Sequence, residues 1–189
     1  MDTRADMYCD ANGIGLIHKK GCSLFVCLSV PFSPRPNYKT AGENARAASL
    51  CCFVESGGRI LTGADETAEY TLLKSSESDG CVTAEFSCNL SDEITVLQSV
   101  SLTCGGVDIK LSGGENIGFM LPLFDFDGAE STEITIAKGL ITCECKGSVC
   151  RYSFSGEACG DFGYFYNRNG RYRVMRVKTD ALHIEIFRK

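Results

Sequence analysis

The chain has 189 residues, of which 44% are hydrophobic, and its formal net charge is −5. A chain of this length and apolar content buries a core without needing disulfides or a metal, and its negative charge gives no bulk support for nucleic-acid binding. Residues 1–6 are polar, which is not typical of a secretion signal. The longest apolar run, residues 24–30, is too short to span a membrane. We therefore expect a cytoplasmic protein.

Short apolar or alternating segments, separated by turn signals, follow one another along the whole chain. Pairs such as Gly57-Gly58 and Asn169-Gly170 favour tight turns between strands. The fifteen expected strands, in chain order, are residues 15–19, 23–30, 49–55, 59–62, 69–74, 82–88, 94–103, 107–111, 116–123, 133–137, 140–145, 149–155, 163–167, 171–178 and 182–187. Only residues 41–48 offer a helical turn. The pattern predicts an all-β protein of about 15 short strands.

The last two strands predict a hairpin around residues 179–180, with one apolar and one polar face. The apolar face consists of Met175, Val177, Leu182 and Ile184. The polar face places Arg176 opposite His183. One-sided sheets of this kind pack face to face, so we expect a large antiparallel β-sandwich, similar to supersandwich folds. Residues 1–189 are expected to form one domain, with residues 1–12 as a loosely ordered tail.

One connection, residues 31–46, is too long for a tight turn. Loops of this length in compact domains are usually functional or flexible. Its side chains include groups that bind carboxylates and hydroxyls: Arg35, Asn37, Tyr38, Lys39, Asn44 and Arg46. We predict that these residues bind a ligand. The alternative is an ordered loop whose charges pair with one another or dock on a neighbouring domain.

The C-terminal part of the chain is basic, since residues 151–189 carry 8 Lys and Arg against 4 Asp and Glu. We expect Arg176 and Tyr172 on the polar face as further ligand-binding residues, with Tyr172 as a platform for a sugar ring. Tyr164 and Tyr166 share the apolar face and are expected in the core. Such a face suits an acidic polysaccharide, although an ordinary solvated sheet surface explains the charges equally well.

Twelve cysteines are an unusually large number for this length. Most lie in strand-like runs, and free cysteine is a common core residue, so we predict reduced thiols, with disulfides as the alternative. Cys143, Cys145 and Cys150 have the spacing closest to a metal site, because the first two share one face of a strand. Structural zinc sites instead use Cys-x2-4-Cys knuckles in loops. We therefore predict small core residues here, and no metal or cofactor.

The two histidines, His18 and His183, are the candidates for general acid–base chemistry. His183 is expected on a surface strand opposite Arg176, whose charge disfavours protonation of the ring. That position is poorly suited to catalysis. His18 ends a strand and remains the single candidate for a general base, which defines a hypothesis of a small enzyme.

The order of segments carries a resemblance to a known family. Residues 13–21 read GIGLIHKKG, a long strand and a proline-rich loop with Asn37-Tyr38 follow, and the chain ends in LHIEIFRK. In this order the chain resembles the C-terminal β-sandwich of heparinase II/III-like polysaccharide lyases. The resemblance implies that an α/α-barrel precedes the sandwich and carries most of the catalytic Tyr, His and Asn residues. No residue of this chain maps onto that set or onto the family's metal site.

The resemblance implies a non-catalytic accessory domain of a carbohydrate-active enzyme, either a polysaccharide lyase or a glycoside hydrolase. Such a domain packs on an upstream helical catalytic domain and borders its substrate cleft. Two alternatives remain open from the residues themselves. One is a stand-alone binding domain for an acidic polysaccharide, using Arg35, Lys39 and residues 168–176. The other is the small enzyme that uses His18.

Overall fold

The computed structural model describes residues 5–8, 14–19, 25–29, 50–65, 67–79, 81–103, 105–126, 128–167 and 170–189. Side chains are described from residue 50 onward, except for residues 77, 162, 165–167 and 170. The loop 31–46 and the possible helical turn at 41–48 lie outside the described residues.

The described part of the chain forms sixteen β-strands. They are β1 (Ala5–Tyr8), β2 (Ile14–Lys19), β3 (Phe25–Ser29), β4 (Cys51–Ser56), β5 (Arg59–Thr62), β6 (Glu69–Ser78), β7 (Cys81–Ser91), β8 (Ile94–Thr103), β9 (Gly106–Ser112), β10 (Ile117–Phe126), β11 (Glu133–Ala137), β12 (Leu140–Cys145), β13 (Ser148–Phe154), β14 (Glu157–Asn167), β15 (Gly170–Lys178) and β16 (Ala181–Arg188). Each of the fifteen expected strands has a counterpart here. The additional strand, β1, lies in the segment for which we expected a loose tail.

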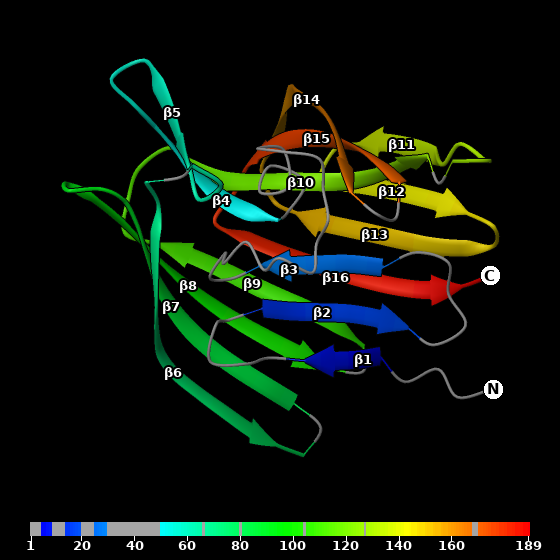
Figure 1. Cartoon of the computed structure of the whole chain (residues 1–189), viewed down its shortest axis with the longest axis horizontal. Coiled ribbons are helices and arrows are strands. Elements are labelled where there is room, and N and C mark those ends of the chain that lie inside the picture. The colour runs from blue at the N-terminus through cyan, green and yellow to red at the C-terminus, as the bar shows by residue number, and fades with distance from the viewer. Residues whose placement is uncertain are drawn as a thin grey trace.

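Three antiparallel sheets build the molecule (Figure 1). The largest has eight strands in the order β11-β12-β13-β16-β9-β8-β7-β6, and the second has five in the order β14-β15-β10-β4-β5. A three-stranded sheet, β1-β2-β3, contacts the largest sheet through β8 and β16. The expectation of an all-β sandwich is confirmed.

The core lies between the five-stranded and eight-stranded sheets. In β8 the burial alternates, so that Val96, Val100 and Leu102 point inward while the residues between them, Gln98 apart, face outward. Strand β10 is different, because residues 118–124 are all buried. Its residues Phe119, Leu121 and Leu123 join the main core, whereas Met120 belongs to a second buried cluster with Cys51, Phe53 and Val174. Full burial of each large apolar side chain contributes about 1.5–3 kcal/mol.

The expected hairpin between β15 and β16 is not formed. Strand β15 pairs with β10 and β14, while β16 pairs with β9 and β13, so the two strands belong to different sheets. The chain crosses between the sheets at Thr179 and Asp180, where the carbonyl of Asp180 accepts a hydrogen bond from the Leu111 amide at 2.7 Å. The four apolar side chains predicted on one face are nevertheless buried in the main core: Met175, Val177, Leu182 and Ile184. They meet across the core rather than side by side. The sequence could not distinguish these two arrangements, because both satisfy the same alternation of apolar and polar residues.

No helix among the described residues is long and apolar enough to span a membrane.

A buried hydrogen bond joins the two large sheets. The hydroxyl of Tyr152 in β13 donates to the carbonyl of Pro122 in β10 at 3.1 Å, and Tyr152 is 1% exposed. We expect Tyr152→Phe to lower the free energy of unfolding by about 1–2 kcal/mol, because the buried carbonyl loses its partner. Urea denaturation measures the change. Tyr164→Phe is the matched control, since Tyr164 is 55% exposed, and should change stability little. Equal stabilities of the two variants would contradict the bridging role of Tyr152.

Candidate functional site

The outward face of the eight-stranded sheet is polar and hollowed. A groove of about 740 Å³ runs over β6–β9, and its outward side chains are Lys74, Ser76, Thr83, Glu85, Ser99, Ser101, Asp108 and Lys110. Hydroxyl and charged side chains make up this set in equal numbers, because alternation along β7, β8 and β9 sends most apolar residues to the core. Lys74 and Glu85 form an ion pair at 2.8 Å, and the Ser76 and Thr83 hydroxyls are 2.7 Å apart.

A second groove, of about 390 Å³, continues the first over β9, β13 and β16. It is lined by Ser153 and His183 and shares Asp108 and Lys110 with the larger groove. The Lys110 side chain makes no hydrogen bond or ion pair with other described residues, so its charge remains available where the grooves meet. The two grooves therefore form one polar surface, which we call the outer groove.

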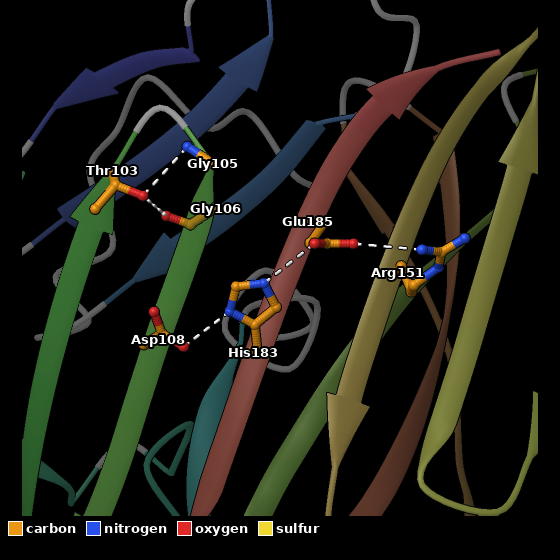
Figure 2. A network of polar contacts seen from close by, with 7 residues as sticks. All are labelled: Thr103, Gly105, Gly106, Asp108, Arg151, His183 and Glu185. Atoms are coloured by element: carbon orange, nitrogen blue, oxygen red, sulfur yellow. Dashed lines mark hydrogen bonds and ion pairs between the residues drawn. The ribbon is translucent and has the colours of Figure 1, made fainter.

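A chain of polar contacts crosses this surface from Asp108 through His183 and Glu185 to Arg151 (Figure 2). The Nδ1 atom of His183 lies 2.8 Å from an Asp108 carboxylate oxygen, and its Nε2 atom lies 3.5 Å from a Glu185 oxygen. Glu185 also accepts a contact from Arg151 at 3.4 Å. The Arg151 guanidinium lies 4.8 Å from the centre of the Phe187 ring, where a cation–π interaction holds it. Each imidazole nitrogen therefore has a carboxylate oxygen within 3.5 Å, and the contact with Asp108 is the hydrogen bond.

The strand register produces this arrangement. His183 is directly opposite Asp108 of β9 and Ser153 of β13, and Glu185 is directly opposite Arg151. His183 and Glu185 lie two residues apart and thus share a face of β16. The alternation His-x-Glu was visible in the sequence, but the partners on β9 and β13 were not.

Our sequence-based interpretation of His183 is wrong in its partner. It placed Arg176 opposite the ring, but Arg176 lies in the other sheet, where its guanidinium contacts Glu55 at 3.3 Å. The neighbours of His183 are carboxylates instead. The error follows from the assumed hairpin, which paired the wrong strands.

The predicted tyrosine platform also needs correction. Tyr172 is only 4% exposed, and its ring packs edge-on against Phe124 with centroids 5.3 Å apart. Strand β15 lies between β14 and β10, so Tyr172 has a packed neighbour where we expected solvent. Conversely, Tyr164, which we expected in the core, is 55% exposed, with the Arg171 guanidinium 5.1 Å from its ring centre. The β14–β15 register is regular from Gly163 to Asn167, so the pairing of these strands by itself does not account for either outcome.

Of the other predicted ligand-binding residues, only Arg176 lies in the part of the chain that the structure describes. Arg176 lies in the five-stranded sheet, where its charge is paired with Glu55. The loop residues Arg35, Asn37, Tyr38, Lys39, Asn44 and Arg46 lie outside the described residues. His18 is placed only by its backbone, in β2 opposite Asp6 and Phe25, and its role stays a prediction.

The cysteines with metal-like spacing lie in the core. Cys143 and Cys150 are directly opposite each other on β12 and β13, and with Cys145 they are at most 4% exposed. Within the part of the chain that the structure describes, no group of three or more His, Cys, Asp or Glu side chains could hold a metal ion. Burial raises the pKa of Cys150 from an ordinary value near 9 to about 12, although a hydrogen bond with Tyr152 acts in the opposite direction.

Comparison with known proteins places few limits on function. No protein-family model matches the chain, and no curated protein matches it. Among solved structures, the chain is similar to heparinase III with a TM-score of 0.49 and 13% sequence identity. The match covers 100% of this chain and 35% of that protein, so the chain spans about a third of its length. The resemblance is a weak structural one and assigns neither an activity nor a ligand.

The raised pKa of Cys150 predicts a loss of stability at alkaline pH. The unfolded thiol ionises near pH 9 while the folded thiol stays protonated up to about 12, so the stabilisation is present below pH 9 and is lost above it. Each pH unit in this window costs up to about 1.4 kcal/mol. The free energy of unfolding, measured by denaturation at several pH values across this window, should fall less steeply with pH for Cys150→Val than for the wild type. The partly exposed Cys159→Val serves as the control, and identical slopes in all three proteins would contradict the prediction.

Gly106 tests the packing around His183. A Cβ atom at this position would lie 2.3 Å from the carbonyl oxygen of Ile184 and 3.3 Å from Cε1 of His183. The Ile184 backbone cannot move away from the new Cβ atom without a cost in free energy. We therefore expect Gly106→Ala to lower stability by about 1–3 kcal/mol and to shift the His183 ring signals in NMR spectra. Gly105→Ala is the matched control, because its nearest neighbour, the Thr103 hydroxyl, would be 3.5 Å away. Unchanged His183 signals in Gly106→Ala would contradict the predicted displacement.

Proposed function

We propose that this chain is a non-catalytic accessory β-sandwich domain of a carbohydrate-active enzyme, and that it contacts the glycan through the outer groove. The outer groove itself is the observation that carries the proposal. Its larger part, about 740 Å³, is within the usual size range of ligand sites, and nine of its eleven lining residues are polar or charged.

The chemistry of the outer groove suits a sugar. Hydroxyl and carboxylate groups exchange hydrogen bonds with sugar hydroxyls, and Ser99, Ser101 and Thr83 present such groups in one row across neighbouring strands. The charges of Lys74 and Glu85 offset each other, so this part of the surface does not demand a highly charged ligand. Strands β7, β8 and β9 are interior strands of the sheet, paired on both sides, so we expect the binding groups that they carry to be in place before the ligand arrives.

The His183 contacts support a binding role better than a catalytic one. A general base needs one imidazole nitrogen directed at the substrate. In this structure Nδ1 is paired with Asp108 at 2.8 Å, and the Glu185 carboxylate lies 3.5 Å from Nε2, the nitrogen that a substrate would have to reach. The histidine thus fixes the rim between the two grooves and orients two carboxylates that can accept hydrogen bonds from sugar hydroxyls.

A stand-alone binding domain for an acidic polysaccharide is the second candidate. The available charge of Lys110 favours it, because Lys110 lies where both grooves meet and can bind a carboxylate or sulfate. Calorimetric titration with neutral and with uronate-containing oligosaccharides separates the two ligand classes. A higher affinity for the uronate-containing oligosaccharides than for the neutral ones, lost in Lys110→Gln, supports an acidic polysaccharide as the ligand. Absence of binding to any oligosaccharide at millimolar concentration sinks both proposals.

The accessory role makes a separate claim about the gene. Sequencing the reading frame around this segment should reveal an adjoining catalytic domain. We expect that domain to be helical and upstream. An intact frame encoding only this sandwich would contradict the accessory role while leaving glycan binding to be decided by calorimetry.

The outer groove can be blocked without disturbing the core. Ser99 is exposed on the outward face of β8, so Ser99→Trp fills the groove while the buried neighbours keep their places. We expect at least a tenfold loss of affinity for the bound oligosaccharide, measured by calorimetry. Ser112→Trp is the matched control, because Ser112 is exposed on the same sheet but does not line the groove, and it should bind as the wild type does. Equal affinities of both variants would place the ligand elsewhere.

A further inference from the structure

The register of the eight-stranded sheet brings polar side chains from six neighbouring strands into one line. Each of them is directly opposite the next, from β6 at one end to β13 at the other. Figure 2 shows two of them, Asp108 and His183, which face each other across β9 and β16. We call this line the polar row. In order along it, the residues are Ser76, Thr83, Ser101, Asp108, His183 and Ser153.

The outer groove is long across the strands and narrow along them. All members of the polar row line it, and they are exposed or half-buried. Neighbouring strands lie about 4.8 Å apart, so the row spans roughly 24 Å from β6 to β13. Along β7, β8 and β9 only two outward positions per strand line the groove, such as Ser99 and Ser101, and these lie about 7 Å apart. The shape of the groove therefore suits an elongated ligand that crosses the strands.

A second line of side chains flanks the polar row on the same face. Its members, each directly opposite the next, are Lys74, Glu85, Ser99 and Lys110. In the polar row itself, the hydroxyls of Ser76 and Thr83 lie 2.7 Å apart and share one hydrogen bond. Each hydroxyl has one donor and two acceptor sites, so this bond leaves further sites unused. The two lines therefore keep donors and acceptors available to a ligand across several strands.

We propose that the outer groove binds a single extended glycan chain that runs across the strands, along the polar row. This inference rests on the proposed function and adds the form and the direction of the ligand. An extended glycan repeats its hydroxyls at an interval comparable with the strand spacing, because one sugar ring and one glycosidic oxygen make up each unit. Successive sugars therefore meet successive strands, and a row with one side chain every 4.8 Å or so accommodates about five sugar units.

The twist of the sheet favours a single chain over the surface of a crystalline polysaccharide. Successive strands of a sheet are rotated by roughly 20–25° about the direction that crosses them. The polar row follows that direction, so it stays nearly straight while its side chains turn gradually. A single glycan chain rotates about its glycosidic bonds and can follow this turn. The flat face of a crystal cannot, and it would touch only a few members of the row.

The length of the oligosaccharide tests the proposal. Calorimetric titration of the wild type uses cello-oligosaccharides as the neutral series and oligogalacturonides as the acidic series, each from two to six units. In the series that binds, we expect the affinity to rise at least tenfold from the shortest to the longest member, because each added unit gains hydrogen bonds along the row. An affinity that no longer rises beyond two units would overturn this inference and leave glycan binding intact. Failure of both series to bind would overturn the proposed function as well.

Substitutions at the two ends of the polar row test its direction. Ser76→Trp obstructs the end on β6, and Ser153→Trp obstructs the end on β13. Each should lower the affinity for the six-unit oligosaccharide at least fivefold and leave the affinity for the three-unit one nearly unchanged, because a short ligand still fits beside the obstruction. Unchanged affinity for the six-unit ligand in both variants would overturn the proposal.

Ser112→Trp is the matched control for direction. Ser112 is exposed on β9, two residues beyond Lys110, so a tryptophan there obstructs a ligand that runs along the strand instead of across it. We expect this variant to bind the six-unit oligosaccharide as the wild type does. A loss of affinity in Ser112→Trp alone would overturn the crosswise direction. If Ser153→Trp fails to fold, Ser76→Trp still decides the outcome, because Ser76 is exposed on the edge strand β6.

Discussion

The packing of two sheets against a shared apolar interior is the constraint on which the rest of this structure depends. Strand β10 is central to it, because residues 118–124 are buried on both faces of the five-stranded sheet. On one side Phe119 and Leu121 reach the main core, and on the other Met120 meets Phe53. The eight-stranded sheet contributes one apolar face only, so its opposite face is left to polar groups and is available for binding.

Strand positions could be predicted from this sequence because period-two alternation and glycine turns are local signals. Pairing partners could not, and the last two strands show why. Met175 and Ile184 are buried whether β15 and β16 lie side by side or face each other across the core. Local alternation is the same in both cases, so sequence reasoning had no means to choose. Tyr172 was misplaced because its burial depends on Phe124 of β10, a neighbour that local alternation does not identify.

The candidate site was accessible to sequence reasoning only in part. Alternation along β8 and β9 already separates Ser99, Ser101 and Asp108 from the core residues between them. The meeting of His183 with Asp108 depends on the pairing of β16 with β9, which joins residues far apart in the chain. The contact of the Gln98 amide with the Cys52 sulfur joins the two large sheets, and it depends on how those sheets are stacked. Contacts of this kind have no local signature, because they are decided by which surfaces fit together.

The crossing at Thr179 and Asp180 has a consequence for how the molecule is made. The last strand, β16, lies in the interior of the eight-stranded sheet, between β13 and β9, and β15 lies in the interior of the other sheet. During synthesis, the edges of β9 and β13 that pair with β16 therefore keep unpaired backbone groups until residues 181–188 leave the ribosome. Such non-local pairing slows folding and leaves nascent strands prone to association with other chains. Both sheets are completed together, by the final two strands.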